Sequence, residues 1–175
     1  IANHPTLIDV VVLIGLMEQA NCVVKQALWS NPFTKGPVQS AGYILNAGSE
    51  QFIQDCVHKL QQDHAASLLI FPEGTRTAKG EQLNEFQRGA ANIALRAGVP
   101  IRPVLISCTP STLTKNEKWY HIPEQPFHIH VKVLDAIRVE DVLDDVTVNP
   151  KNVRQLNQQL QWFFNQELSV NEQSC

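Results

Sequence analysis

Residues 67–77, Ser-Leu-Leu-Ile-Phe-Pro-Glu-Gly-Thr-Arg-Thr, are the stretch of the chain that decides its class of fold. An apolar run that stops at Pro72 is typical of a buried strand giving way to a loop, and α/β proteins bind ligands in such loops. Gly74 permits close backbone approach, and Arg76 offers a fork of donors suited to phosphate or carboxylate. The stretch therefore predicts an α/β fold with a binding loop. The alternative is an ordinary turn with a surface pair of Glu73 and Arg76.

Helices and strands are expected to alternate on both sides of this stretch. The hydrophobic periodicity predicts helices at 5–20, 49–64, 86–97 and 150–168, and strands at 22–25, 67–71, 101–107 and 127–134. Gly98 is expected just past the end of the third of these helices. A short helix is expected near 32–37, and a long surface excursion at 108–126. The pattern predicts one α/β domain over 1–175, with a mostly parallel sheet flanked by helices.

The composition narrows the class of protein further. The chain has 175 residues, 43% of them hydrophobic, and a net charge of -3, which argues against nucleic acid as a partner. Its four cysteines are far apart without CxxC spacing, as expected for a reduced interior. His128 and His130 share a strand face but lack further ligands, so no metal site is expected. No apolar run reaches the roughly 18 residues of a membrane span.

The first ten residues, Ile-Ala-Asn-His-Pro-Thr-Leu-Ile-Asp-Val, place a histidine just before a helix and an acid about one turn inside it. A carboxylate can hold one imidazole nitrogen protonated and leave the other free to accept a proton. His4 and Asp9 are therefore candidate catalytic residues. The alternative makes Asn3 or Thr6 a helix cap and Asp9 a first-turn acid favoured by the helix dipole. Because the chain starts inside this motif and without a methionine, we expect a truncated N-terminus.

These segments together resemble the glycerolipid acyltransferase family, whose members include the 1-acylglycerol-3-phosphate acyltransferases. "NHPTLIDV" resembles the family's first motif, Asn-His-x-x-x-x-Asp (HX4D), and "FPEGTRT" resembles its third. "KQALWSNPFTKGPVQSAGYI" resembles the linking region, and "FQRGAANIALRAGVPIRPV" the stretch that ends in the fourth motif. The resemblance covers about residues 2–107. One departure concerns residues 42–48, which carry no basic residue where the family's second motif usually carries an arginine.

The resemblance implies a glycerolipid-acyltransferase-like fold and a function in phospholipid biosynthesis. A fatty acyl group would move from acyl-CoA or acyl carrier protein to the hydroxyl of a lysophospholipid or related phosphorylated lipid. His4 would be the base and Asp9 would orient it. The expected substrate contacts are Glu73, Gly74, Thr75, Arg76 and Lys25, although Lys25 is equally well explained as a solvated residue at a strand end.

No cofactor is expected beyond the acyl donor as co-substrate. The expected location is the cytoplasmic face of the inner or another membrane, either peripheral or anchored by a segment missing from this chain. Three alternatives stay open. The first is a thioester hydrolase that uses the same pair on water. The second is an acyltransferase acting on a non-glycerol lipid intermediate of a polyketide-like pathway. The third is a binding protein with a decayed site.

Overall fold

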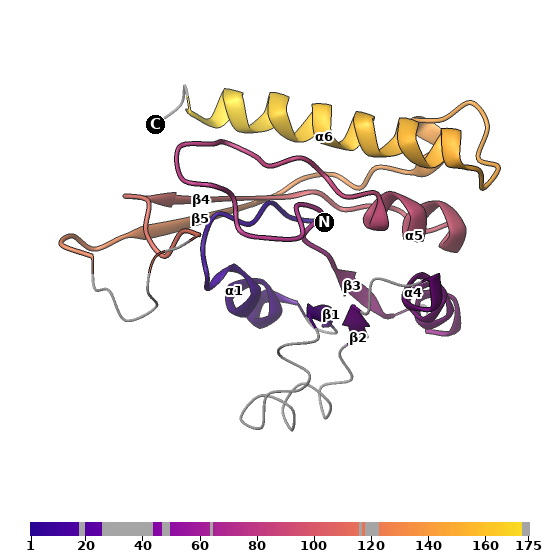
Figure 1. Cartoon of the computed structure of the whole chain (residues 1–175), viewed down its shortest axis with the longest axis horizontal. Coiled ribbons are helices and arrows are strands. Elements are labelled where there is room, and N and C mark those ends of the chain that lie inside the picture. Colours follow the sequence, from indigo (N-terminus) through magenta and orange to yellow (C-terminus); the bar gives the residue numbers. More distant parts are fainter. Residues whose placement is uncertain are drawn as a thin grey trace.

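The computed structural model describes residues 1–17, 20–25, 44–46, 50–63, 65–115, 117 and 123–172. Strands β1 (Ala20–Lys25), β2 (Ile44–Asn46) and β3 (Ser67–Leu69) form a parallel sheet in the order β2-β1-β3. Strands β4 (Val104–Thr109) and β5 (His128–Val133) form an antiparallel pair. Figure 1 shows both sets of strands between the helices. The predicted mostly parallel α/β sheet is confirmed, with β5 as the antiparallel exception.

The first three residues lie between β3 and β4. The Ala2 amide donates to the Ile70 carbonyl at 3.1 Å, and the Val104 amide donates to the Ile1 carbonyl at 2.9 Å. The Asn3 side chain also pairs with the Ile106 backbone, donating to its carbonyl at 2.8 Å and accepting from its amide at 2.7 Å. This extended segment connects the two sets of strands and fixes where the chain emerges at His4.

In the described residues, four α-helices surround the strands: α1 (Asp9–Leu16), α4 (Glu50–Gln62), α5 (Gly89–Ala97) and α6 (Pro150–Glu172). A short 3-10 helix, η1 (Val139–Asp141), precedes α6. The helix predicted at 5–20 is shorter than expected, because the residues before Asp9 fold around its carboxylate instead of entering the helix. Gly98 ends α5 in the left-handed conformation at φ 65°, as predicted.

The starts of α5 and α6 have local causes. The helix predicted from residue 86 begins at Gly89, because the Gln87 amide donates to the Pro72 carbonyl at 2.7 Å. Helix α6 begins at Pro150, a residue that needs no partner for a backbone amide in the first turn. The Asn149 side chain accepts from the Asn152 amide at 2.8 Å and caps this helix.

Strand alternation divides the core between the two faces of the sheet. Ile106 packs with Leu13 of α1, whereas the adjacent Leu105 packs with Leu156 and Phe164 of α6. Figure 1 accordingly shows α1 and α6 on opposite sides of β4 and β5. The short helix predicted near 32–37 lies outside the described residues, as does part of the excursion at 108–126. In the described part of the chain, no helix combines the length and apolar character needed to cross a bilayer.

Candidate active site

His4 and Asp9 form a hydrogen-bonded pair at the start of α1. His4 Nδ1 lies 2.9 Å from Asp9 Oδ2, and the Asp9 side chain is 0% exposed. The same carboxylate accepts from the Thr6 amide at 2.8 Å and from the Thr6 hydroxyl at 2.5 Å. An ionised carboxylate only accepts hydrogen bonds, so the pairing assigns the proton of a neutral imidazole to Nδ1 and leaves Nε2 as the acceptor.

The helix-cap alternative explains only part of this geometry. Asp9 does lie in the first turn of α1, where the helix dipole favours an acid. The N-cap residue, however, is Ile8, and no side chain caps the helix. Asn3 is paired with Ile106, and the Thr6 hydroxyl donates to Asp9. The Asp9 carboxylate therefore interacts favourably with the dipole at the N-terminal end of α1 and also holds the His4 imidazole.

The His4 residue is held by contacts from a second loop. Its ring stacks on Phe71 with centroids 4.3 Å apart. Its amide donates to Glu73 Oε1 at 2.8 Å, and its carbonyl accepts from the Thr77 amide at 2.7 Å. The first and third sequence motifs, 69 residues apart at this contact, thus form one hydrogen-bonded unit.

The carboxylate of Glu73 is occupied by donors of the protein. It is 4% exposed and accepts from the His4 amide, the Thr77 hydroxyl at 2.9 Å and the Asn84 amide at 2.8 Å. The Asn84 side chain in turn donates to the Arg76 carbonyl at 3.1 Å and accepts from the Ala78 amide at 3.2 Å. The sequence around Asn84 contains no motif that would have predicted its contacts with Glu73 and Arg76. The predicted substrate contact through Glu73 stays a prediction, whereas its bracing of the loop is visible in the structure.

Gly74 and Thr75 form the turn of this loop, and Gly74 is exposed. Gly74 adopts φ 67°, a conformation that side chains disfavour, and its amide donates to the Phe71 carbonyl at 3.0 Å. This amide is therefore engaged within the turn. Thr75 is half-buried. The structure thus places both predicted residues in the loop that holds His4.

Arg76 contacts backbone carbonyls, so the alternative of a surface pair between Glu73 and Arg76 does not hold. Its Nη1 donates to the Leu113 carbonyl at 2.9 Å and to the Thr114 carbonyl at 2.8 Å. Among the described residues, no carboxylate lies within ion-pair distance of its guanidinium. A half-buried cation without a counter-ion is suited to an anionic ligand.

Lys25 ends β1, in register with Asn46 of β2. Its side chain lies outside the described part of the chain, so its predicted contact stays a prediction. Only residues 44–46 of the second-motif stretch are described.

Cys108 is close enough to Asp9 for the carboxylate charge to act on its thiol. Partial burial raises the pKa of the Cys108 thiol, and the charges of Asp9 and Glu117 raise it further, against a lowering by a hydrogen bond from the Thr112 backbone. A raised pKa keeps the sulfur protonated near neutral pH. Cys108 is therefore not an activated nucleophile beside the pair.

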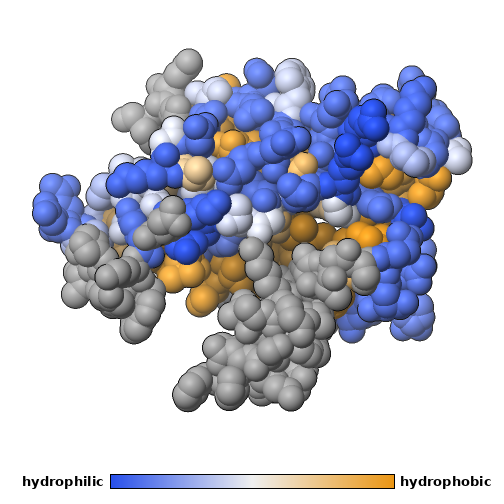
Figure 2. All heavy atoms as spheres, viewed as in Figure 1, coloured by the Kyte–Doolittle hydropathy of each residue, from blue (hydrophilic) through white to orange (hydrophobic). Residues whose placement is uncertain are grey.

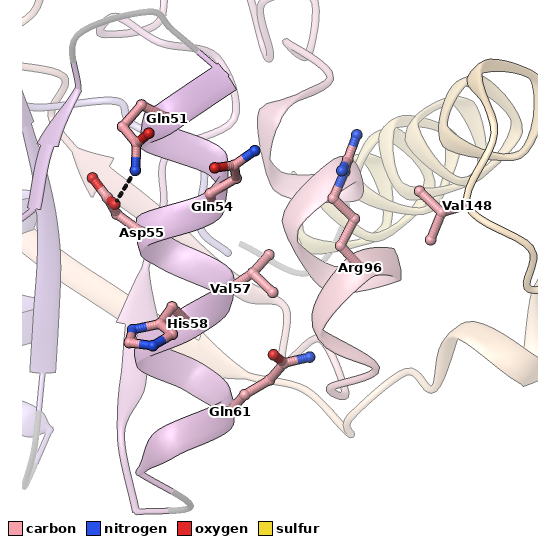
Figure 3. Close-up of a pocket in the computed structure, with 8 residues that line it drawn as sticks. All are labelled: Gln51, Gln54, Asp55, Val57, His58, Gln61, Arg96 and Val148. Carbon is pink, nitrogen blue, oxygen red and sulfur yellow. Dashed lines mark hydrogen bonds between the residues drawn. The ribbon is translucent and has the colours of Figure 1, made fainter.

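A separate hollow of about 640 Å³ lies between α4 and α5. Figure 3 shows Gln54, Val57 and Gln61 of α4 pointing toward Arg96 of α5. Arg96 is already paired with Glu50 at 3.2 Å. None of the predicted site residues is among those that line this hollow. Its histidine and its acid contact glutamines in the described part of the chain: His58 Nε2 lies 3.0 Å from the side-chain amide nitrogen of Gln62, and Asp55 accepts from the Gln51 side chain at 2.8 Å. We therefore place the candidate active site at His4 and not in this hollow.

An oriented imidazole beside a cationic loop, on an α/β sheet, is typical of enzymes that activate a hydroxyl group or water. Residues 1–107 match the family model described as Acyltransferase, and the chain belongs to this acyltransferase family. The predicted family is thereby confirmed.

Curated relatives support the same family. The chain is 36% identical over 172 residues to 1-acyl-sn-glycerol-3-phosphate acyltransferase alpha of Mus musculus, covering 88% of this chain and 55% of the relative. It is 31% identical over 152 residues to the 1-acyl-sn-glycerol-3-phosphate acyltransferase of Saccharomyces cerevisiae, covering 83% of this chain and 48% of the relative. The chain thus spans about half the length of these relatives.

A solved structure shares the fold. The crystal structure of the 1-acyl-sn-glycerophosphate (LPA) acyltransferase PlsC from Thermotoga maritima aligns with a TM-score of 0.67 at 17% identity. The alignment covers 98% of this chain and 64% of that chain. The predicted glycerolipid-acyltransferase-like fold is confirmed.

Proposed function

We propose that this chain transfers a fatty acyl group from a thioester donor to the hydroxyl of a lipid acceptor. The observation that carries the proposal is the 2.9 Å contact between His4 Nδ1 and the fully buried Asp9 carboxylate. This contact presents an imidazole whose second nitrogen is free to accept a proton. The names of the relatives point to the same reaction class.

The proposed reaction needs only this pair and the two substrates. His4 Nε2 takes the proton of the acceptor hydroxyl while its oxygen attacks the thioester carbonyl carbon. The tetrahedral intermediate collapses, the carbon–sulfur bond breaks, and the leaving thiolate takes the proton from the imidazolium. Asp9 stabilises the imidazolium between these steps, as the acid of a Ser-His-Asp triad does, with the substrate alcohol in place of serine. A positioned base of this kind contributes about 10²–10⁴-fold.

The proposed acceptor is a lysophospholipid or a related phosphorylated lipid. Arg76 is proposed to bind its anionic group, since Nη1 is held by two carbonyls and the edge formed by Nε and Nη2 has no partner among the described residues. Gly74, Thr75 and Lys25 are proposed as further contacts. The donor is proposed to be acyl-CoA or acyl carrier protein, without a cofactor.

The proposed place of action is a membrane surface. Between Asp9 and Leu16, α1 carries no charged side chain, and its outer face exposes Val11 (72% exposed) and Leu16. Leu7, just before the helix, is exposed as well. Figure 2 shows apolar side chains gathered at the position of α1, on the side of the sheet away from α6. An apolar face next to the base would let a lipid acceptor reach His4 without leaving the bilayer surface. The cytoplasmic face is proposed because of the scattered cysteines, of which Cys56 and Cys108 are free thiols.

Mass spectrometry of the products from a lysolipid panel tests this proposal. The purified protein is incubated with an acyl-CoA or an acyl carrier protein donor, and each lysolipid is supplied separately. The proposal expects a new diacylated product, fastest with a phosphate-bearing acceptor. Free fatty acid formed at the same rate with and without lysolipid would instead indicate thioester hydrolysis.

A further inference from the structure

Residues 112–115 form a short strap beside the active-site loops, outside the stretch that the family model matches. The Leu113 carbonyl accepts two hydrogen bonds, from the Leu7 amide at 3.0 Å and from Arg76 Nη1 at 2.9 Å. The Thr114 carbonyl accepts a second bond from Arg76 Nη1 at 2.8 Å. One peptide carbonyl therefore joins the segment that carries His4 to the loop that carries Arg76.

The strap holds an unusual backbone conformation to present these carbonyls. Leu113 has φ 55°, in the left-handed region that a bulky residue rarely adopts. Such outliers persist only where the surrounding structure holds them, and they are frequent at ligand sites. Thr112 and Thr114 are buried on either side, and the Thr114 amide donates to Glu117 Oε2 at 2.9 Å. The buried Thr114 hydroxyl has no hydrogen-bond partner within the described segments.

We infer that the strap is a positioning element for acceptor binding, an inference that rests on the proposed function. The two carbonyls take both hydrogens of Arg76 Nη1 and fix the plane of the guanidinium before any ligand arrives. The edge formed by Nε and Nη2 then remains to bind an anionic oxygen pair by two parallel bonds. Because an unrestrained arginine loses rotamer freedom on binding, this preorganisation strengthens acceptor binding. The bond from the Leu7 amide to the same Leu113 carbonyl connects the strap to the segment that carries His4.

Substitutions at Leu113 that differ in their preferred φ test the inference. Proline fixes φ near −65° and moves both carbonyls, whereas glycine adopts the left-handed conformation freely. Leu113→Pro should raise the KM for 1-acyl-sn-glycerol 3-phosphate about tenfold or more, approaching the value for Arg76→Ala, with the KM for acyl-CoA unchanged. Leu113→Gly should stay within about threefold of the wild type. Combining Leu113→Pro with Arg76→Ala should add little to the effect of Arg76→Ala alone.

Two controls complete the experiment: a less disruptive substitution at Leu113 and an acceptor without a charged group. Leu113→Val disfavours positive φ through its branched Cβ and replaces Leu113→Pro if the proline variant does not fold. With monoacylglycerol as acceptor, neither the Pro nor the Val variant should change the acceptor KM, since no anionic group is present for Arg76 to bind.

Two results would overturn the inference. The first is a folded Pro or Val variant with an unchanged KM for the phosphorylated acceptor, although Arg76→Ala raises it. The second is a lower melting temperature together with a fall in turnover and an equal rise in the KM of both substrates. That result would mean that the strap only supports the fold. If Arg76→Ala itself leaves the acceptor KM unchanged, the proposed role of Arg76 in acceptor binding fails before the strap is considered.

Discussion

At the scale of single residues, the Asp9 carboxylate contacts three donors: the amide and the hydroxyl of Thr6, and the His4 imidazole that it orients. Asp9→Asn keeps the size of the side chain but replaces one acceptor oxygen by an NH₂ donor. That donor would face either His4 or the donors of Thr6, all of which now contact the carboxylate. We therefore expect turnover to fall at least about 10²-fold, since the wrong tautomer and orientation disable the base.

Steady-state kinetics and thermal unfolding of the same Asp9→Asn preparation measure this effect. A fall in turnover with the fold retained supports the role of Asp9 in catalysis. A change in melting temperature with normal turnover would reduce Asp9 to the helix-dipole acid.

Glu73 offers a second test at this scale. Glu73→Ala leaves the His4 amide, the Asn84 amide and the Thr77 hydroxyl without their acceptor, and each unsatisfied buried group costs about 1–3 kcal/mol. We expect a clear loss in the free energy of unfolding and a lower turnover, because the His4 backbone loses its support. Glu81→Ala, at an exposed position of the same loop, is the matched control and should be near neutral. Equal unfolding curves for the two variants would contradict the bracing role.

At the scale of elements, the outer face of α1 distinguishes a membrane-active enzyme from one that acts in solution. Val11→Glu places a charge at a 72% exposed position, so the fold should tolerate it. We expect it to weaken cosedimentation with phosphatidylcholine vesicles severalfold. Val170→Glu, the same change at a 58% exposed position of α6 on the other side of the sheet, should have little effect. If both variants bind vesicles equally well, α1 is not the surface that meets the lipid.

Local rules predicted some element boundaries and not others. Gly98 ends α5 as expected, because a left-handed helix end depends on the glycine itself. The late start of α1 depends on the Asp9 carboxylate, which accepts from the Thr6 amide and so competes with helix formation before Asp9. Hydrophobic periodicity does not predict such a side-chain contact. Residues 1–3 lie between strands because of partners about 70 and 100 residues away, Ile70 and Val104.

In the active site as well, the sequence predicted the contacts between nearby residues and missed those between distant ones. His4 and Asp9 are near in sequence, so their pairing follows from spacing and chemistry. The bond from Arg76 to Leu113 spans 37 residues and the bond from Asn84 to Glu73 joins an inconspicuous asparagine. No local pattern marks either contact.

At the scale of the whole molecule, α6 completes the core although it lies beyond the residues that the family model matches. Phe164 is fully buried and packs edge-on against Phe86, with ring centroids 5.2 Å apart. We expect Phe164→Ala to lower the free energy of unfolding by about 3–5 kcal/mol through the cavity it leaves. Trp162→Ala, at a 60% exposed position of the same helix, should cost far less. Similar denaturation midpoints for both variants would contradict a core shared between α6 and the motif-bearing part.

The central claim is that His4 is the base for acyl transfer, and His4→Ala tests it most directly. Turnover of acyl-CoA and 1-acyl-sn-glycerol 3-phosphate is followed by mass spectrometry of the diacylated product, for wild type and variant preparations with matching circular dichroism and melting curves. The proposed mechanism predicts a loss of about 10²–10⁴-fold in turnover for His4→Ala, because no other group next to the Asp9 carboxylate is proposed to take the hydroxyl proton. Near-normal turnover by a folded His4→Ala protein would contradict it.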